Sequence, residues 1–254
     1  MVELNATDGH KLKAYRADPA APPKGAVVIL HEVLGVNSHI REISDTLAAQ
    51  GYVAIAPSLL DRAEAGVELD FDEASVAKGE DLVKQLDMKG AIADIQAAIE
   101  AVKDAGKVAV VGYGWGGGLA YHSGNYVDDL SCVIAYYGEG ILDAYAEKRR
   151  VPTLLHFGEK DTTIPYGLVD HFRNRRPDIA SFTYPAAQNF DCQKRGGYDE
   201  ASAAQALERT LFWLSQYLAG PGPVQMKNAG AYANVSEKSA KKKKPVASED
   251  GPPE

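Results

Sequence analysis

The residues of this chain with the clearest potential for chemistry surround one glycine-rich turn, within residues 107–120 (KVAVVGYGWGGGLA). The valine-rich run that begins the segment is short and favours a buried strand, and the glycines that follow tolerate a sharp reversal into a helix. A turn of the form G-x-S-x-G holds an attacking Ser or Cys at its tip. In Gly112-x-Gly114-x-Gly116 the tip is itself glycine, so this turn supplies no nucleophile.

Strands and helices are expected to alternate around this turn. Asp8-Gly9 indicates a hairpin within residues 2–15, and Ser38 is the expected N-cap of a helix that ends at Gly51. Apolar runs indicate strands at 25–30, 52–56, 107–113, 132–137, 153–157 and 181–184, and further helices are expected at 73–85, 92–106, 115–124, 166–175 and 201–218. This alternation predicts an α/β fold with a mostly parallel central sheet and helices on both faces. Functional groups should then follow the carboxyl ends of the strands.

Composition restricts the classes of function. The chain has 254 residues and a formal net charge of −8, unlike the basic face of a nucleic-acid-binding domain. No apolar run reaches the ~18 residues of a membrane span, and residues 1–5 show no features of a secretion signal. Cys132 and Cys192 form neither a disulfide framework nor a metal-ligand pattern. We expect a cytoplasmic protein that binds a small molecule, without a cofactor, nucleic acid or membrane.

The composition changes after Leu218. We expect one domain over residues 1–219 and a disordered polar tail over residues 220–254. The tail contains a lysine run at 241–244, which could attract an anionic protein partner, although a solvated tail is the simpler interpretation. The domain is expected to be a monomer or a weak dimer.

Several segments taken together resemble the dienelactone hydrolase family of α/β hydrolases. In chain order they are residues 31–37 (HEVLGVN), 51–57 (GYVAIAP), 112–117 (GYGWGG), 135–138 (AYYG), 158–165 (GEKDTTIP) and 184–190 (YPAAQNF). Their common order over residues 8–219 carries the resemblance, which implies an α/β-hydrolase fold and hydrolysis of carboxylic esters or lactones.

The resemblance also implies roles for particular positions. The family uses a Cys or Ser, a His and an Asp, with a Glu that helps to activate the thiol and two backbone N–H groups that stabilise the oxyanion. The Asp corresponds to Asp161 and the Glu to Glu32. The two N–H groups would belong to Val33 and Trp115.

At the other two triad positions this chain departs from the family. The nucleophile corresponds to Gly114 and the His to Gln188, so both the covalent intermediate and a base near neutral pH are lost. The arginines that hold a substrate carboxylate in the family's prototype correspond to Cys192 and to a position near Val76. These substitutions favour an inactive or weakly active hydrolase that binds a small ester-, lactone- or carbonyl-like ligand.

One alternative is an active ester or lactone hydrolase that uses displaced residues. Glu32 or His31 would activate water over the surviving oxyanion site, or Cys192, which is close in sequence to the His position, would face the pocket. His122 and His156 are expected to be packed polar residues rather than catalysts.

A minor alternative is a dinucleotide-binding protein. Gly112-x-Gly114-x-x-Gly117 fits G-x-G-x-x-G after a strand, and Glu139 lies past the next strand, where the ribose-binding acid would be expected.

Overall fold

The computed structural model describes residues 1–219, which belong to one compact unit. The predicted tail over residues 220–254 and its lysine run lie outside the described residues. The division of the chain at residue 219 therefore stays a prediction.

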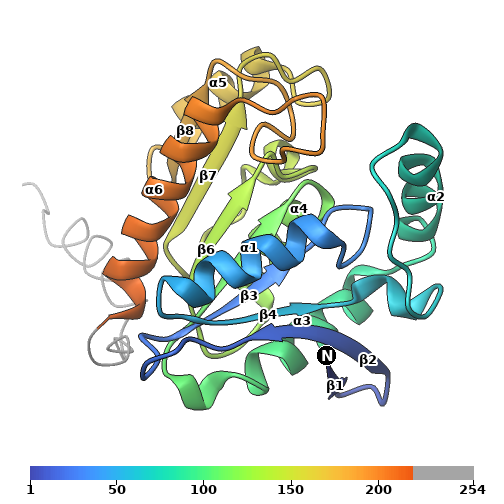
Figure 1. Ribbon diagram of the computed structural model, residues 1–254. Coiled ribbons are helices and arrows are strands. Elements are labelled where there is room, and N and C mark those ends of the chain that lie inside the picture. Colours follow the sequence, from blue (N-terminus) through green and yellow to red (C-terminus); the bar gives the residue numbers. More distant parts are fainter. Residues whose placement is uncertain (220–254) are drawn as a thin grey trace, which may run out of the picture. The chain divides into compact units, whose positions relative to one another are not determined.

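An eight-stranded sheet forms the centre of this unit, in the order β1-β2-β4-β3-β5-β6-β7-β8 (Figure 1). The strands are β1 Val2–Asn5, β2 Lys11–Ala17, β3 Ala26–Leu30, β4 Val53–Pro57, β5 Val108–Tyr113, β6 Leu130–Tyr136, β7 Thr153–Gly158 and β8 Ala180–Tyr184. β1 and β2 form an antiparallel hairpin, and β2 pairs antiparallel with β4. The remaining pairs are parallel, so the predicted mostly parallel sheet is confirmed.

Helices cover both faces of the sheet (Figure 1). They are α1 Ser38–Ala49, α2 Glu73–Val83, α3 Met88–Glu100, α4 Trp115–Tyr126, α5 Tyr166–Arg175 and α6 Glu200–Leu218. Successive residues of a strand point to opposite faces. Val27 of β3 accordingly packs in the core that includes α1 and α6, and Val28 packs in the core that includes α3 and α4. Within residues 1–219, no helix combines the length and apolarity needed to cross a membrane.

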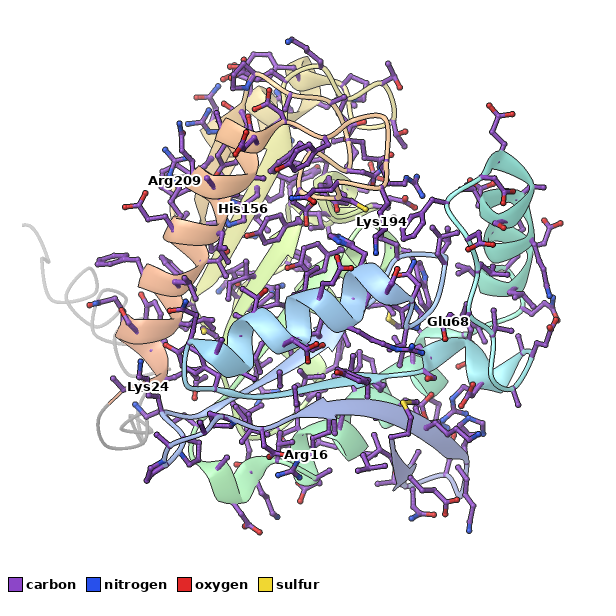
Figure 2. The ribbon with its side chains drawn as sticks, in the orientation of Figure 1. Arg16, Lys24, Glu68, His156, Lys194 and Arg209 are labelled. Carbon is purple, nitrogen blue, oxygen red and sulfur yellow. The ribbon has the colours of Figure 1, made fainter. Side chains whose placement is uncertain are left out.

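The start of α1 differs by one residue from the sequence prediction. Asn37, not Ser38, is the N-cap: its backbone is extended, and its Oδ1 accepts the N–H of Ile40 at 3.3 Å. Both residue types are good N-caps, so the local sequence did not decide between them. Ser38 is the first helical residue, and its hydroxyl lies 2.7 Å from the ammonium of Lys194, which comes from the loop before α6 (Figure 2).

Candidate functional site

The turn between β5 and α4 has Gly114 at its tip. Gly114 has a φ of +52° and a ψ of −120°, a conformation in which a residue with a side chain is strained. A Cβ at this position would nevertheless meet only ordinary contacts, the nearest being Glu32 Cγ at 3.6 Å. The turn therefore has room for a Cβ at position 114.

The neighbouring glycines are required by close packing. A Cβ at Gly112 would lie 2.0 Å from the carbonyl oxygen of Gly116, and a Cβ at Gly116 would lie 2.4 Å from that of His31. A Cβ at Gly117 would lie 2.8 Å from the carbonyl oxygen of Tyr136. These contacts account for Gly112 and Gly117, two of the three glycines of the G-x-G-x-x-G pattern, through the packing of α4 and without a dinucleotide.

Asp161, in the loop after β7, has one engaged and one free carboxylate oxygen. Its Oδ1 accepts the N–H groups of Thr163 at 2.7 Å and Ile164 at 2.9 Å. Its Oδ2 is buried and has no hydrogen-bond partner within residues 1–219. Gln188, at the position where the resemblance expects a His, lies in a half-buried turn after β8. The pairing of Asp161 with the residue at position 188 stays a prediction.

Val33 and Trp115, the predicted oxyanion-site residues, lie after β3 and at the start of α4. The Val33 peptide packs against α2, since a Cβ at Gly79 would lie 2.2 Å from the Val33 oxygen. The Trp115 ring lies 5.8 Å from the His31 ring, between centroids. The role of the two N–H groups stays a prediction.

Glu32 belongs to a chain of buried and half-buried polar side chains, which we call the buried polar chain: Arg195, Glu32, Tyr137, Asp191 and His39. Arg195 Nη1 lies 3.6 Å from Glu32 Oε2, and the Tyr137 hydroxyl lies 3.4 Å from Glu32 Oε1. The same hydroxyl donates to Asp191 Oδ1 at 2.7 Å, and Asp191 Oδ2 lies 3.5 Å from His39 Nε2. Burial raises the pKa of Glu32 above its ordinary value, although the charge of Arg195 opposes this shift.

Sequence reasoning missed four members of this chain. Arg195 lies three residues beyond the position where the resemblance expected an arginine, and its guanidinium still reaches Glu32. Tyr137 was part of a recognised segment, but its φ of +37°, which is rare for an aromatic residue, was not predictable. His39 lay within the predicted helix, and nothing in the local pattern indicated its partner Asp191.

The environment of His39 predicts a pH dependence of stability. Burial alone would lower the pKa of His39, but its interactions with the nearby Asp191 carboxylate and with Cys192 outweigh burial and raise the pKa from 6.5 to about 10. A histidine whose pKa is higher in the folded state than in the unfolded state stabilises the fold. This stabilisation is complete below the unfolded-state pKa and is lost as the pH rises toward the folded-state pKa. Between about pH 7 and about pH 9.5, the free energy of unfolding should fall by roughly 1 kcal/mol per pH unit relative to a His39→Gln variant. Urea unfolding of both proteins across this range measures the difference, and parallel pH profiles would contradict the prediction.

The two displaced candidates occupy different surroundings. Both ring nitrogens of fully buried His31 are engaged, Nδ1 with the Glu32 carbonyl at 2.5 Å and Nε2 as acceptor for the Leu59 N–H at 3.1 Å. Burial also lowers the pKa of His31 to about 4, so His31 is not placed to act as the spare base. Cys192 is fully buried and neighbours His39.

The remaining candidate histidines are packed as expected. His156 lies beneath α6 (Figure 2), with Nδ1 2.8 Å from the Tyr184 hydroxyl and Nε2 3.2 Å from Thr210 Oγ1. His122 lies 3.7 Å from the carboxylate of Glu147. Within residues 1–219, no group of three or more His, Cys, Asp or Glu side chains is arranged to hold a metal ion.

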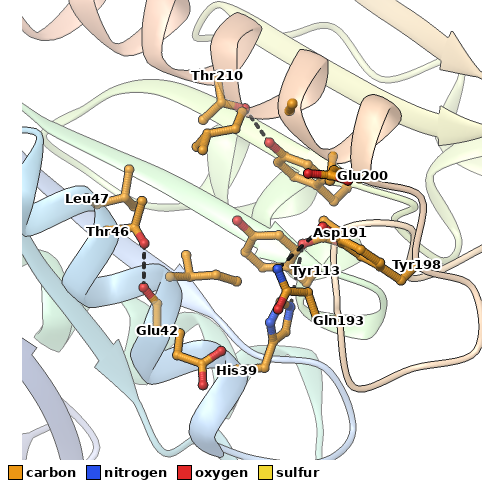
Figure 3. Close-up of a pocket in the computed structure, with 15 residues that line it drawn as sticks. His39, Glu42, Thr46, Leu47, Tyr113, Asp191, Gln193, Tyr198, Glu200 and Thr210 are labelled. Atoms are coloured by element: carbon orange, nitrogen blue, oxygen red, sulfur yellow. Dashed lines mark hydrogen bonds and ion pairs between the residues drawn. The ribbon is translucent and has the colours of Figure 1, made fainter.

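Two pockets lie at opposite ends of the buried polar chain. The first, which we call the α1/α6 pocket, has a volume of about 340 Å³ and includes His39 and Asp191 in its wall (Figure 3). The second, the α2 pocket, has a volume of about 410 Å³ and lies between α2, where Val76 lines it, and the segment that contains Arg195. Neither pocket is lined by Gly114, which is buried with Glu32 beside it.

The strand order, the turn at Gly114 and the loops after β3, β7 and β8 define an α/β hydrolase. The chain belongs to the dienelactone hydrolase family, whose family model matches residues 12–218. It is 32% identical over 227 residues to the carboxymethylenebutenolidase of Pseudomonas putida, covering 84% of this chain and 95% of that protein. Carboxymethylenebutenolidase 1 of Cupriavidus pinatubonensis is 30% identical over 226 residues, covering 84% and 95%. The structure of a candidate dienelactone hydrolase from Klebsiella pneumoniae matches with a TM-score of 0.73 at 27% identity, covering 85% of this chain and 98% of that one.

Proposed function

We propose that this dienelactone-hydrolase-like protein binds a small ester, lactone or related carbonyl compound without forming the acyl-enzyme intermediate of a nucleophilic hydrolase. The observation that carries the proposal is glycine at the tip of the turn, with a φ of +52°. Nucleophilic catalysis needs an attacking atom and a base to accept its proton. Position 114 supplies no such atom, and the amide of Gln188 cannot accept and release a proton as an imidazole does.

Arg195 and the α2 pocket suggest the ligand class. The name carboxymethylenebutenolidase, borne by the relatives, specifies a lactone that carries a carboxylate. Arg195 lines the α2 pocket, and a guanidinium can bind a carboxylate through two parallel hydrogen bonds. We therefore propose a lactone with a carboxylate substituent, held by Arg195, as the preferred ligand.

Binding of carboxymethylenebutenolide tests this proposal. Calorimetric titration should show binding, and chromatography of the same sample should recover the lactone with its ring intact. Arg195→Met should weaken binding roughly 10- to 100-fold, the usual effect of losing a hydrogen-bonded charge. Lys78→Met is the matched control, because Lys78 pairs with Glu64 on the exposed side of α2. Rapid ring opening by the unaltered protein, or equal binding by Arg195→Met, would contradict the proposal.

A second candidate function is slow hydrolysis by a water molecule that Glu32 activates. It is favoured by the position of Glu32, whose Cγ would lie 3.6 Å from a Cβ at position 114. The hydrolysis of p-nitrophenyl acetate distinguishes the two functions. Turnover above the uncatalysed rate that disappears in Glu32→Gln, but persists in the exposed control Glu42→Gln, would support hydrolysis.

A further inference from the structure

The α1/α6 pocket lies between α1 and α6 and shares no lining residue with the α2 pocket, in which the proposed function places its ligand. Tyr113 and Tyr136 contribute stacked rings, with centroids 4.7 Å apart. Ile43 and Leu47 of α1 and Leu207 of α6 provide aliphatic walls. Figure 3 shows these helices on opposite sides of the Tyr113 ring. A mostly apolar pocket with few polar groups is the usual form of a small-molecule site.

The wall of this pocket contains an unused hydrogen-bond donor. His39 is 6% exposed, and its Nε2 is buried without a hydrogen-bond partner within residues 1–219. The carboxylate oxygen of Asp191 is 3.5 Å away, which is too long for a good N–H···O bond. An unsatisfied buried donor costs free energy, and an oxygen atom near both groups would remove that cost.

We propose that the α1/α6 pocket binds a small neutral phenol, whose hydroxyl accepts the His39 Nε2–H and donates to the carboxylate of Asp191. Such a hydroxyl satisfies both partners, because one oxygen atom can accept and donate at the same time. The aromatic ring of the ligand would pack against Tyr113 and Tyr136, where offset or edge-to-face contacts are favourable.

The charges around the pocket favour a neutral ligand over an anion. His39 is already balanced by Asp191, and Glu42 is balanced by Lys194 at 2.7 Å. Glu200, in the first turn of α6, adds a further carboxylate to the lining. An aromatic carboxylate would therefore meet net negative charge, whereas a phenol below its pKa of about 10, the value of the tyrosine phenol, would not.

Calorimetric titration of the full chain with 4-methylphenol near neutral pH tests the proposal, with toluene and 4-methylbenzoate as comparison ligands. We expect 4-methylphenol to bind at least about 10-fold more tightly than either, as loss of a hydrogen bond to a charged group predicts. Ala203→Trp should abolish binding, because Ala203 lines the pocket. Ala201→Trp is the matched control on an exposed position of the same helix. Arg195→Met is titrated as well, because Arg195 lines the α2 pocket.

Three results would overturn the proposal. Toluene could bind as tightly as 4-methylphenol, in which case the hydroxyl is not recognised. Ala203→Trp could retain full affinity, or 4-methylphenol could fail to bind the unaltered protein. Loss of binding in Arg195→Met with retention in Ala203→Trp would assign the phenol to the α2 pocket and would also contradict the proposal. None of these results depends on whether carboxymethylenebutenolide binds, so the phenol site and the proposed function fail independently.

Discussion

Replacing Gly114 by Cys and Gln188 by His in the same chain should create an esterase. A Cβ at position 114 has room, because the nearest atom would be 3.6 Å away. The new imidazole would find an acceptor in Asp161 Oδ2, which is buried and unpartnered within residues 1–219. A positioned base alone contributes about 10²- to 10⁴-fold, so p-nitrophenyl acetate should be hydrolysed at least about 100-fold faster than by the unaltered protein.

Two further proteins separate this gain from nonspecific effects. Gly114→Ala combined with Gln188→His has the base without the nucleophile, and it should stay at the level of the unaltered protein. Adding Asp161→Asn to the Cys and His variant should remove most of the new activity, because the imidazole loses its orienting carboxylate. A folded double variant that hydrolyses no ester or lactone would show that Gly114 does not occupy the nucleophile position.

The substitution Gly116→Ala should prevent folding or reduce the free energy of unfolding by more than about 4 kcal/mol, at the extreme of single-residue effects. A Cβ there would lie 2.4 Å from the carbonyl oxygen of His31 and 2.5 Å from that of Leu30. Both atoms belong to the backbone at the end of β3, so neither can move without displacing the strand. Urea unfolding followed by circular dichroism measures the loss.

The matched control is Gly114→Ala in the same turn. Here the methyl group has space, and the cost is only that of the positive φ, about 1–3 kcal/mol for a strained backbone conformation. Gly114→Ala should therefore remain folded and cooperative. Equal losses for the two substitutions would mean that the packing of α4 on β3 is not what requires glycine at position 116.

The fold was largely predictable because its signals are local. The valine run before Gly112 and the regular apolar positions of the helix at 201–218 identify their elements from adjacent residues, since burial imposes a period on the sequence. The turn at Gly114 was also predictable from local sequence, because Gly112, Gly114 and Gly116 lie at alternate positions directly after a buried strand. The N-cap of α1 was wrong by one residue, since Asn37 and Ser38 are chemically equivalent for that task.

The buried polar chain was not predictable, because its contacts join residues that are far apart in sequence. Tyr137 and Glu32 are separated by 105 positions, and their contact depends on the positive φ of Tyr137. Arg195 lies in a segment without strand or helix periodicity, where pattern arguments give no direction for a side chain. The guanidinium of Arg195 contacts Glu32 because of the path of the loop before α6, and no local sequence pattern specifies that path.

His39 and Arg195 stand at the two ends of one line of polar contacts, and each opens onto a different pocket. Binding of the lactone can change the affinity for the phenol only by the same factor by which the phenol changes the affinity for the lactone. This holds because the free protein, the two singly bound forms and the doubly bound form make a closed thermodynamic cycle. A phenol titration with the lactone site saturated, and the converse, must therefore return the same coupling free energy. The coupling free energy from these two measurements would state how strongly the line of polar contacts connects the two sites.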